Sequence, residues 1–372
     1  MNRIYLDNNA STPVDQAVCK IISQVLQDNV GNPSSIHSFG RNSKNILTNS
    51  RDIIASYLRV KPAEIIFTSG GTEGANLLLR GLCSYFSTGH IITSAVEHAC
   101  IYTTLQLMQS KGWNVSFLQP GLWGAVTPEA VKKAIRPDTK FISLMAVNNE
   151  TGVKTDIEAI GQIAQEANIP LIVDAVAWIG KEPISIPPGV SALFFSGHKI
   201  HASKGVGALY IKSNLKFDSI MSGGEQEYMR RGGTENLPGI AGLAEAVRQL
   251  QTELPEGTHR MQKLRDLLET ELIQAIPGVS VNGEGPRICN TTNLAFNGVD
   301  GEAFMTALDM RGIAISHGSA CSSGALEPSR VLLNMGIPRS KARSSIRISL
   351  SRLTTENEIQ ECVKAIRSYF KV

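Results

Sequence analysis

From about residue 50 to residue 250, short apolar runs alternate with segments of helical periodicity. The apolar runs are continuous, which is typical of strands in a sheet that is buried on both faces. We predict strands over residues 64–69, 90–94, 115–118, 141–146, 171–174 and 192–195, with helices over 73–82, 99–111, 128–135 and 157–167. This rhythm indicates an α/β fold with a mostly parallel, doubly wound sheet.

After Gly239 the pattern becomes a long helical stretch, which we divide into two helices because Pro255 interrupts it. The tail mixes predicted strands (292–296, 314–316, 345–350) with predicted helices (301–311, 356–369). A chain of 372 residues is long enough for two domains. We therefore expect a large domain over residues 13–255 and a smaller α+β domain formed by residues 1–12 and 256–372.

Composition narrows the classes of partner. The net charge is only +3 and the sequence has no Lys/Arg run, which argues against nucleic acid. No stretch approaches 18 apolar residues and the N-terminus has no apolar signal core, so we expect a cytoplasmic protein without a membrane segment. The six cysteines are scattered without a Cys-x-x-Cys motif, which argues against a disulfide framework and a thiolate zinc site. We predict no metal site.

Two charged residues follow neighbouring predicted strands. Lys199 ends the motif Ser-Gly-His-Lys, and Asp174 ends the strand before it. Ligands of such sheets bind at the carboxyl ends of the strands. A lysine can form a Schiff base with an aldehyde, and a carboxylate can keep a pyridine nitrogen protonated, so this pair suits pyridoxal phosphate. Ser196 and His198 lie close enough in sequence to assist proton transfer. The alternative for Lys199 is an ordinary surface lysine.

Further polar residues follow the neighbouring strands. Gly71 and Thr72 open a helix, where close backbone approach and free N–H groups would bind a phosphate; the alternative is a plain glycine-rich turn. His98 could stack on a flat cofactor ring or move protons, or it could be structural. The amide of Asn149 could bind a ring hydroxyl or a substrate carboxylate, or it could cap a turn.

Three motifs lie outside this run of strands. The loop over residues 223–236 is rich in glycine and arginine, so Thr234 and the arginines could bind an anion, unless the loop is simply exposed. Cys321 lies among small residues, which favours access to a reactive thiol, and we expect the other five cysteines to be buried. Arg347 interrupts an apolar strand and should pair with a carboxylate of the protein or of a substrate.

Taken together, these motifs resemble the cysteine desulfurases of the Nif/Isc type. Those are pyridoxal-phosphate enzymes of the class V aminotransferase family, with the aspartate-aminotransferase fold (fold type I). The resemblance runs nearly end to end. The motifs that carry it are Tyr5-Leu-Asp-Asn-Asn-Ala10, Gly31-Asn-Pro-Ser-Ser35, Thr68-Ser-Gly-Gly-Thr72-Glu, Glu97-His98, Val147-Asn-Asn-Glu-Thr-Gly152, Asp174-Ala, Ser196-Gly-His-Lys199, the Arg-x-Gly-Thr-x-Asn loop, Gly318-Ser-Ala-Cys321, Leu326-Glu-Pro-Ser329 and Ser344-Ser-Ile-Arg347.

The resemblance implies an activity and a role for each residue. L-cysteine would become L-alanine, with a persulfide on Cys321 that supplies an iron–sulfur scaffold or another sulfur acceptor. Lys199 would carry the cofactor as a Schiff base and Asp174 would pair with its ring nitrogen. His98 would stack on the ring and help in proton transfer. The other implied ligands are Gly71, Thr72, Ser196 and His198 for the phosphate, Thr234 of the other subunit of a homodimer for the same phosphate, and Asn149 and Arg347 for the substrate carboxylate.

One position departs from the family pattern. Ala177 stands where members usually have a glutamine that donates a hydrogen bond to the cofactor's 3′-oxygen. A methyl group donates none, so we expect altered cofactor absorbance or slower turnover with the fold retained. The sequence also ends at Val372, whereas Isc-type members often have a longer tail that contacts the scaffold, so the acceptor stays open. The alternatives are a selenocysteine lyase or another cofactor enzyme of the same fold, and a non-catalytic partner protein.

Overall fold

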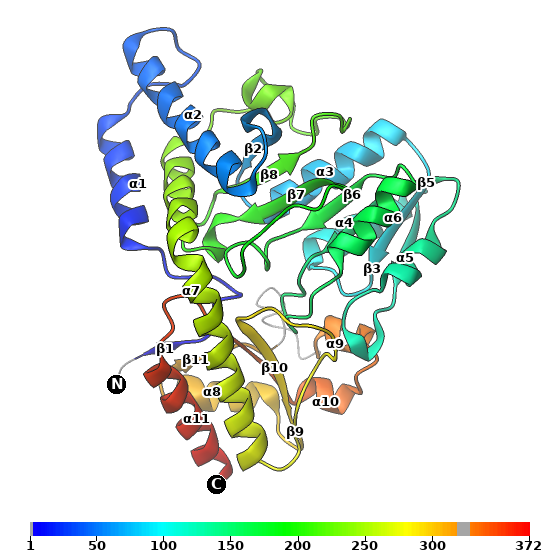
Figure 1. The fold of residues 1–372 in the computed structure, drawn as a ribbon, viewed down its shortest axis with the longest axis vertical. Helices are drawn as coiled ribbons and strands as arrows, with labels where there is room; N and C mark the ends of the chain where they lie inside the picture. The colour runs from blue at the N-terminus through cyan, green and yellow to red at the C-terminus, as the bar shows by residue number, and fades with distance from the viewer. Residues whose placement is uncertain (1–2, 318–327) are drawn as a thin grey trace.

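The computed structural model describes residues 3–317 and 328–372, so Cys321 lies outside the described residues (Figure 1). A 7-stranded sheet with the order β2-β8-β7-β6-β5-β3-β4 forms the upper part of the view. Its strands are β2 (Ile65–Thr68), β3 (His90–Ser94), β4 (Asn114–Leu118), β5 (Thr139–Met145), β6 (Leu171–Asp174), β7 (Val190–Ser196) and β8 (Gly207–Ile211). Strand β8 pairs antiparallel with β2 and β7, and the other pairings are parallel. The predicted mostly parallel sheet is confirmed.

Successive residues of a strand point to opposite faces of the sheet. Because the residues on both faces of this sheet are apolar, helices cover both faces. Phe194 packs into one apolar cluster with α3 and α4, whereas Leu193 and Phe195 pack into another with α1, α2, α6 and α7. The bounds are α1 (Gln16–Asp28), α2 (Ser38–Leu58), α3 (Gly71–Phe86), α4 (Ala99–Ser110), α5 (Pro128–Ala134), α6 (Ile157–Glu166) and α7 (Leu237–Ala275). The sheet is therefore doubly wound, as the continuous apolar strands predict.

A smaller layer lies at the other end of the molecule (Figure 1). It contains the antiparallel sheet β12-β10-β9 and the parallel pair β1-β11. The strands are β1 (Ile4–Tyr5), β9 (Val279–Val281), β10 (Thr291–Phe296), β11 (Ile313–Ala314) and β12 (Ser345–Ser349), and the helices are α8 (Gly301–Asp309), α9 (Arg330–Asn334), α10 (Arg339–Arg343) and α11 (Glu356–Phe370). The first residues of the chain thus lie in the same layer as its last third.

The prediction of two helices on either side of Pro255 is wrong. Helix α7 runs without a break from Leu237 to Ala275 and joins the two layers (Figure 1). The proline removes one backbone donor, but buried residues such as Leu254 and Met261 pack on both sides of it. Tertiary packing therefore outweighs the local preference to end the helix. A domain boundary at residue 255 falls inside this helix and stays a prediction.

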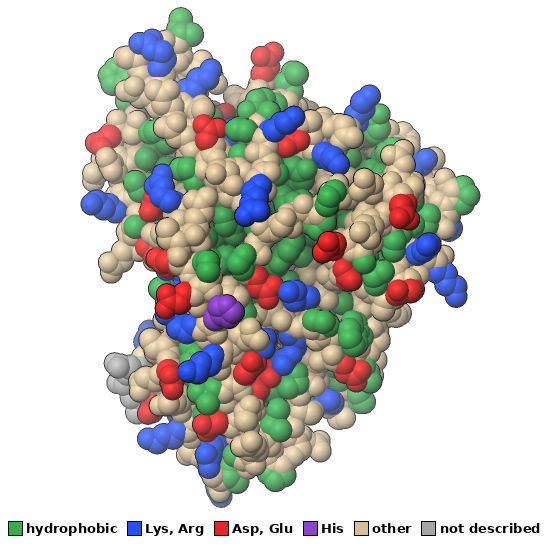
Figure 2. Space-filling view, in the orientation of Figure 1, with side chains coloured by type: hydrophobic (Ala, Val, Ile, Leu, Met, Phe, Trp, Pro, Cys, Tyr) green, Lys and Arg blue, Asp and Glu red, His purple; other side chains and the backbone are tan. Residues whose placement is uncertain are grey.

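The face in Figure 2 carries Lys/Arg and Asp/Glu side chains interspersed, in keeping with the small net charge. Within residues 3–317 and 328–372, no helix is both long and apolar enough to cross a membrane.

Candidate active site

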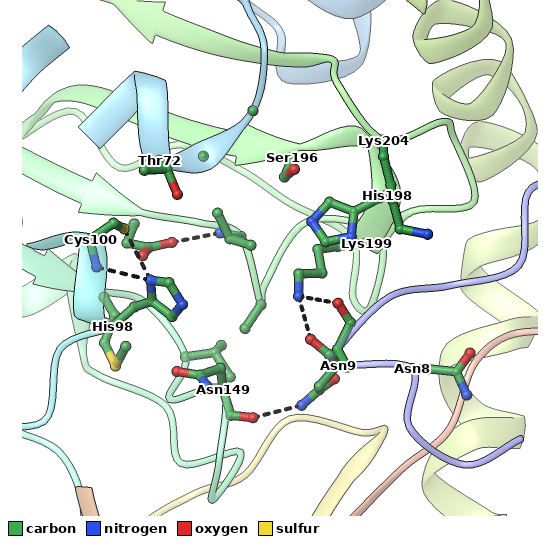
Figure 3. A pocket seen from close by; sticks show the side chains of 18 of the residues that line it. Asn8, Asn9, Thr72, His98, Cys100, Asn149, Ser196, His198, Lys199 and Lys204 are labelled. Atoms are coloured by element: carbon green, nitrogen blue, oxygen red, sulfur yellow. Dashed lines mark hydrogen bonds between the residues drawn. The ribbon is translucent and has the colours of Figure 1, made fainter. Parts of the chain in front are cut away.

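A cavity of about 380 Å³ lies at the carboxyl ends of β5, β6 and β7. It is lined by most of the residues that the sequence singles out: Gly71, Thr72, His98, Asn149, Asp174, Ser196, His198, Lys199 and Arg347. Figure 3 shows Thr72 and Ser196 at one end of the cavity and Asn149 at the other, with His98 and Lys199 between them. Thr234 is exposed and does not line this cavity.

Lys199 reaches the cavity from a short 3₁₀ turn, η3 (Gly197–Lys199), directly after β7. Its Nζ donates to the backbone oxygen of Asn9 at 2.5 Å and of Ala10 at 2.8 Å (Figure 3). Its own backbone oxygen accepts from Nζ of Lys181 at 2.9 Å. The amine of Lys199 therefore borders the cavity, and the hydrogen bond from Lys181 fixes the backbone of Lys199.

Asp174 ends β6 and is 5% exposed. Its Oδ1 accepts from the backbone N–H of Val176 at 2.9 Å. Burial raises the pKa of Asp174 to about 6, against the opposing effects of the Val176 hydrogen bond and the Lys199 charge. A buried carboxyl with few donors has a high affinity for a proton, so it is suited to pair with a protonated ring nitrogen.

His98 caps the N-terminus of α4, where its Nδ1 accepts from the backbone N–H of Cys100 at 3.2 Å. Burial, together with the charges of Lys199 and Arg330, lowers the pKa of His98 to about 4. The ring is therefore neutral near pH 7. Because Nδ1 is occupied as an acceptor, the ring proton is assigned to Nε2.

The turn between β2 and α3 has the properties of an anion cradle. Gly70 has φ 149°, a conformation that residues with a side chain rarely adopt. A Cβ on Gly71 would lie 2.8 Å from Cγ2 of Val176, so only glycine keeps this approach open. The first amides of a helix such as α3 have no partner within the helix and lie at its positive end. Thr72 and Ser196 add hydroxyl groups beside them.

The opposite wall comes from the smaller layer. Arg347 on β12 is 1% exposed, and it donates to Oδ1 of Asp7 at 2.7 Å and to the backbone oxygen of Asn149 at 3.0 Å. The predicted carboxylate partner is thus found within the protein. Asn149 Oδ1 is buried without a hydrogen-bond partner among the described residues, which leaves an acceptor at this end of the cavity.

The cysteine prediction is wrong for two residues. Cys19 is exposed on α1, and Cys100 is half-buried and lines the cavity, with its Sγ 3.0 Å from His98 Nδ1. Cys83, Cys289 and Cys362 are buried as expected. The apolar residues beside a cysteine in the sequence do not show whether the cysteine lies in the core. Cys19 lies on the outer face of a helix, and Cys100 lies in the first turn of one.

Sequence reasoning also missed several residues that border the site. Asn9 and Ala10 hold the amine of Lys199, Asp7 holds Arg347, and Lys181 supports the backbone of Lys199. The available signal was the motif from Tyr5 to Ala10, in which an aspartate and two asparagines come after the short strand β1. Ala177 lies in the cavity lining, where the sequence comparison with the family placed it.

The comparisons with known proteins agree with this geometry. The model of the family described as Aminotransferase class-V matches residues 4–362. Cysteine desulfurase 2 of Trichormus variabilis is 42% identical over 367 residues, which cover 98% of this chain and 92% of the relative. Cysteine desulfurase IscS of Methanosarcina thermophila is 39% identical, with 98% and 91% covered. The chain belongs to the class V aminotransferase family.

Solved structures show the same fold. A NifS-like protein superposes with a TM-score of 0.92 at 33% identity, and the match covers 100% of both chains. SspA, which was solved in complex with cysteine, superposes with a TM-score of 0.84 at 34% identity, covering 95% of this chain and 100% of the other. The predicted fold class is confirmed.

Proposed function

We propose that this chain is a pyridoxal-phosphate-dependent cysteine desulfurase. It would convert L-cysteine to L-alanine and leave the sulfur as a persulfide on Cys321. The observation that carries the proposal is that the amine of Lys199 and the buried carboxyl of Asp174 border one cavity with the glycine turn before α3. Relatives named cysteine desulfurase and the cysteine complex of SspA support the reaction and the substrate.

The cavity fits the cofactor at three points. The glycine turn, Thr72, Ser196 and His198 would hold its phosphate, because they offer amide and hydroxyl donors at one end of the cavity. Asp174 would hold the ring nitrogen, and the imidazole of His98 offers a flat neutral face. When bound, the cofactor supplies an electron sink for the substrate's α-carbon.

Lys199 would bind the cofactor and afterwards hold or release a proton at Nζ. The carbonyl groups of Asn9 and Ala10 can accept from the ammonium form and keep it beside the cavity. His98 is neutral and carries its proton on Nε2, so this atom can donate a hydrogen bond without adding charge. Nζ of Lys199 can therefore take up or release the proton while the imidazole of His98 stays neutral.

Arg347 would bind the carboxylate of L-cysteine. Its guanidinium has five N–H donors, and the contacts with Asp7 and Asn149 leave further donors for a substrate. Asp7 fixes one side of the group, so a substrate would meet it already oriented. The proposed net reaction balances without an oxidant, since L-cysteine and a thiol give L-alanine and a persulfide: the substrate's C–S bond breaks, an S–S bond forms, and the thiol proton ends on the alanine methyl group.

A homodimer would complete the site through Thr234. Several large apolar side chains are exposed in the same loop (Tyr228, 51%; Met229, 70%) and in the segment around the start of α2 (Ile36, 91%; Phe39, 59%). One of them, Tyr228, lines a hollow of about 540 Å³ together with Pro33 and Glu235. An exposed apolar surface of this kind favours contact with a second copy of the chain. The sulfur acceptor would be an iron–sulfur scaffold or another protein.

The function is tested by supplying L-cysteine and a reductant to the holoenzyme and measuring alanine and sulfide. We expect both products from the wild type and neither from Lys199→Ala. Cys321→Ala should lose sulfide release. An aminotransferase needs no thiol, so unchanged turnover in Cys321→Ala would contradict the proposal. Faster turnover of L-selenocysteine that also survives Cys321→Ala would favour a selenocysteine lyase.

A further inference from the structure

Arg330 makes an unusual set of contacts at the start of α9. Its Nη1 donates to the backbone oxygen of Ala95 at 2.5 Å, and its Nη2 donates to the backbone oxygen of Glu97. Its guanidinium carbon lies 3.9 Å from the centre of the Tyr102 ring. One side chain thus bonds two carbonyl groups of the β3–α4 turn and stacks on α4, and this turn carries His98.

The rest of α9 packs on the same turn. Asn334 Nδ2 also donates to the backbone oxygen of Ala95, at 2.7 Å. Val96, the central residue of the turn, is 2% exposed and lies in an apolar cluster with Val331, Leu332 and Met335. The helix is only five residues long, so these tertiary contacts must supply most of its stability.

Ser329, the N-cap of α9, is attached to the turn that carries Asn149, another residue of the cavity lining. Its hydroxyl donates to Oε2 of Glu150, which is 4% exposed and follows Asn149. The hydroxyl also accepts from the backbone N–H of Leu332 at 3.2 Å. Two consecutive residues, Ser329 and Arg330, therefore attach the start of α9 to the turns that present Asn149 and His98.

His317, the last described residue before Cys321, contacts the other layer of the molecule. His317 Nε2 lies 2.9 Å from the backbone oxygen of Arg343, at the end of α10 in the smaller layer. The described chain before Cys321 is thus tied to the smaller layer, and the described chain after it is tied to the larger one. Cys321 is eight residues before Ser329 in the sequence.

We propose that Arg330 is a positioning residue for sulfur transfer: it fixes the first described residues after Cys321 against the turn that carries His98. The inference rests on the proposed function. Arginine suits this role because its planar fork can bond two carbonyl groups while its face stacks on an aromatic ring. Lysine keeps the charge but has no planar face to stack on Tyr102, and glutamine loses both the charge and the stacking.

The test compares two steps in the holoenzyme of Arg330→Gln. The first is the affinity for L-alanine, followed by the cofactor absorbance, which needs no thiol. The second is the single-turnover rate at which L-cysteine adds one sulfur to Cys321, followed by mass spectrometry. Since misplacement by about 1 Å can cost a hundredfold, we expect the persulfide rate to fall about 10- to 100-fold while the alanine affinity changes less than about threefold.

Three further variants sharpen the test. Arg330→Lys should recover part of the rate, and Tyr102→Leu, which removes only the stacking, should lose less than Arg330→Gln. Arg80→Gln changes an exposed arginine on α3 and should match the wild type. An unchanged persulfide rate in both Arg330→Gln and Tyr102→Leu would overturn the inference, and so would an equal loss of alanine affinity. A wild type that forms no persulfide on Cys321 would overturn the proposed function as well.

Discussion

The two walls of the cavity are built in different ways. On the wall from the large sheet, Asp174 ends β6 and Lys199 ends the short turn after β7, and the pairing of these two strands brings them together. On the wall from the smaller layer, Arg347 meets Asp7 across a separation of 340 residues. The first wall is assembled from local strand–turn units, whereas the second exists only when the first residues of the chain join its last third.

This difference separates the two tasks of the site. The local wall carries the groups expected to bind the cofactor, and burial gives Asp174 and His98 strongly shifted pKa values. The long-range wall carries the groups expected to bind the substrate, and there Arg347 is already neutralised by Asp7. We therefore expect changes on the first wall to impair chemistry and changes on the second to impair substrate affinity.

The largest effect should come from Asp174→Asn on the local wall. The neutral amide has no negative charge to stabilise a protonated ring nitrogen, so we expect turnover to fall at least about a hundredfold. The measurement is the rate of alanine formation at saturating L-cysteine. Loss of affinity for L-cysteine without loss of maximal rate would contradict the division between the walls.

The same variant should gain stability without cofactor. The pKa of Asp174 in the fold, about 6, exceeds its ordinary value of 3.8. The folded protein therefore binds the proton more tightly, and the unfolding free energy of the wild type falls as pH rises between about 4 and 6. Above pH 6 this cost is as much as about 3 kcal/mol. Urea unfolding of the apo forms at pH 5 and pH 8 should show that the advantage of Asp174→Asn grows with pH; a gain that is absent or equal at both would contradict this.

An intermediate effect is expected from Arg347→Gln on the long-range wall. Loss of charged hydrogen bonds to the substrate carboxylate should raise KM for L-cysteine about 10- to 100-fold, with a smaller change in kcat. Arg347→Lys keeps the charge but loses the planar pair of guanidinium donors, so its KM should lie between those of the wild type and Arg347→Gln. The cofactor absorbance of both variants should match the wild type. A shifted absorbance with unchanged KM would assign Arg347 to the cofactor instead.

The smallest effect is expected from Ala177→Gln. The added amide offers one donor to the cofactor's 3′-oxygen, and one hydrogen bond is worth about 1 kcal/mol, so the rate should rise by no more than about fivefold. The more sensitive readout is the pH dependence of the cofactor absorbance, which should shift because the donor favours the ionised oxygen. Ala177→Ser is the matched control, since its shorter side chain brings a hydroxyl donor. No change in either the rate or the absorbance would refute the role given to this position.

The contrast between the walls also explains how much the sequence could predict. Strand and helix periodicity predicted the large sheet and placed Asp174, His98 and Lys199 at one edge, because each lies directly beside its strand. The resemblance to the desulfurases predicted that Arg347 binds substrate, and Arg347 lines the same cavity. Neither predicted that Asp7 pairs with Arg347, since nothing local connects two residues at opposite ends of the chain.

The errors have a related physical cause. Pro255 predicts a break only if local preference decides, but packing along α7 keeps the helix continuous. Helices α9 and α10, of five residues each, were missed because their stability comes from contacts with distant turns. The contacts of Arg330 belong to this class and became visible only in the folded chain.

The central claim is that the cofactor is attached to Lys199. Borohydride reduction of protein purified with vitamin B6 present, followed by peptide mass spectrometry, tests it most directly. We predict a single stable adduct, on Lys199, and its absence from Lys199→Ala. An adduct on Lys181 or Lys204, which also line the cavity, or no adduct at all, would contradict the account.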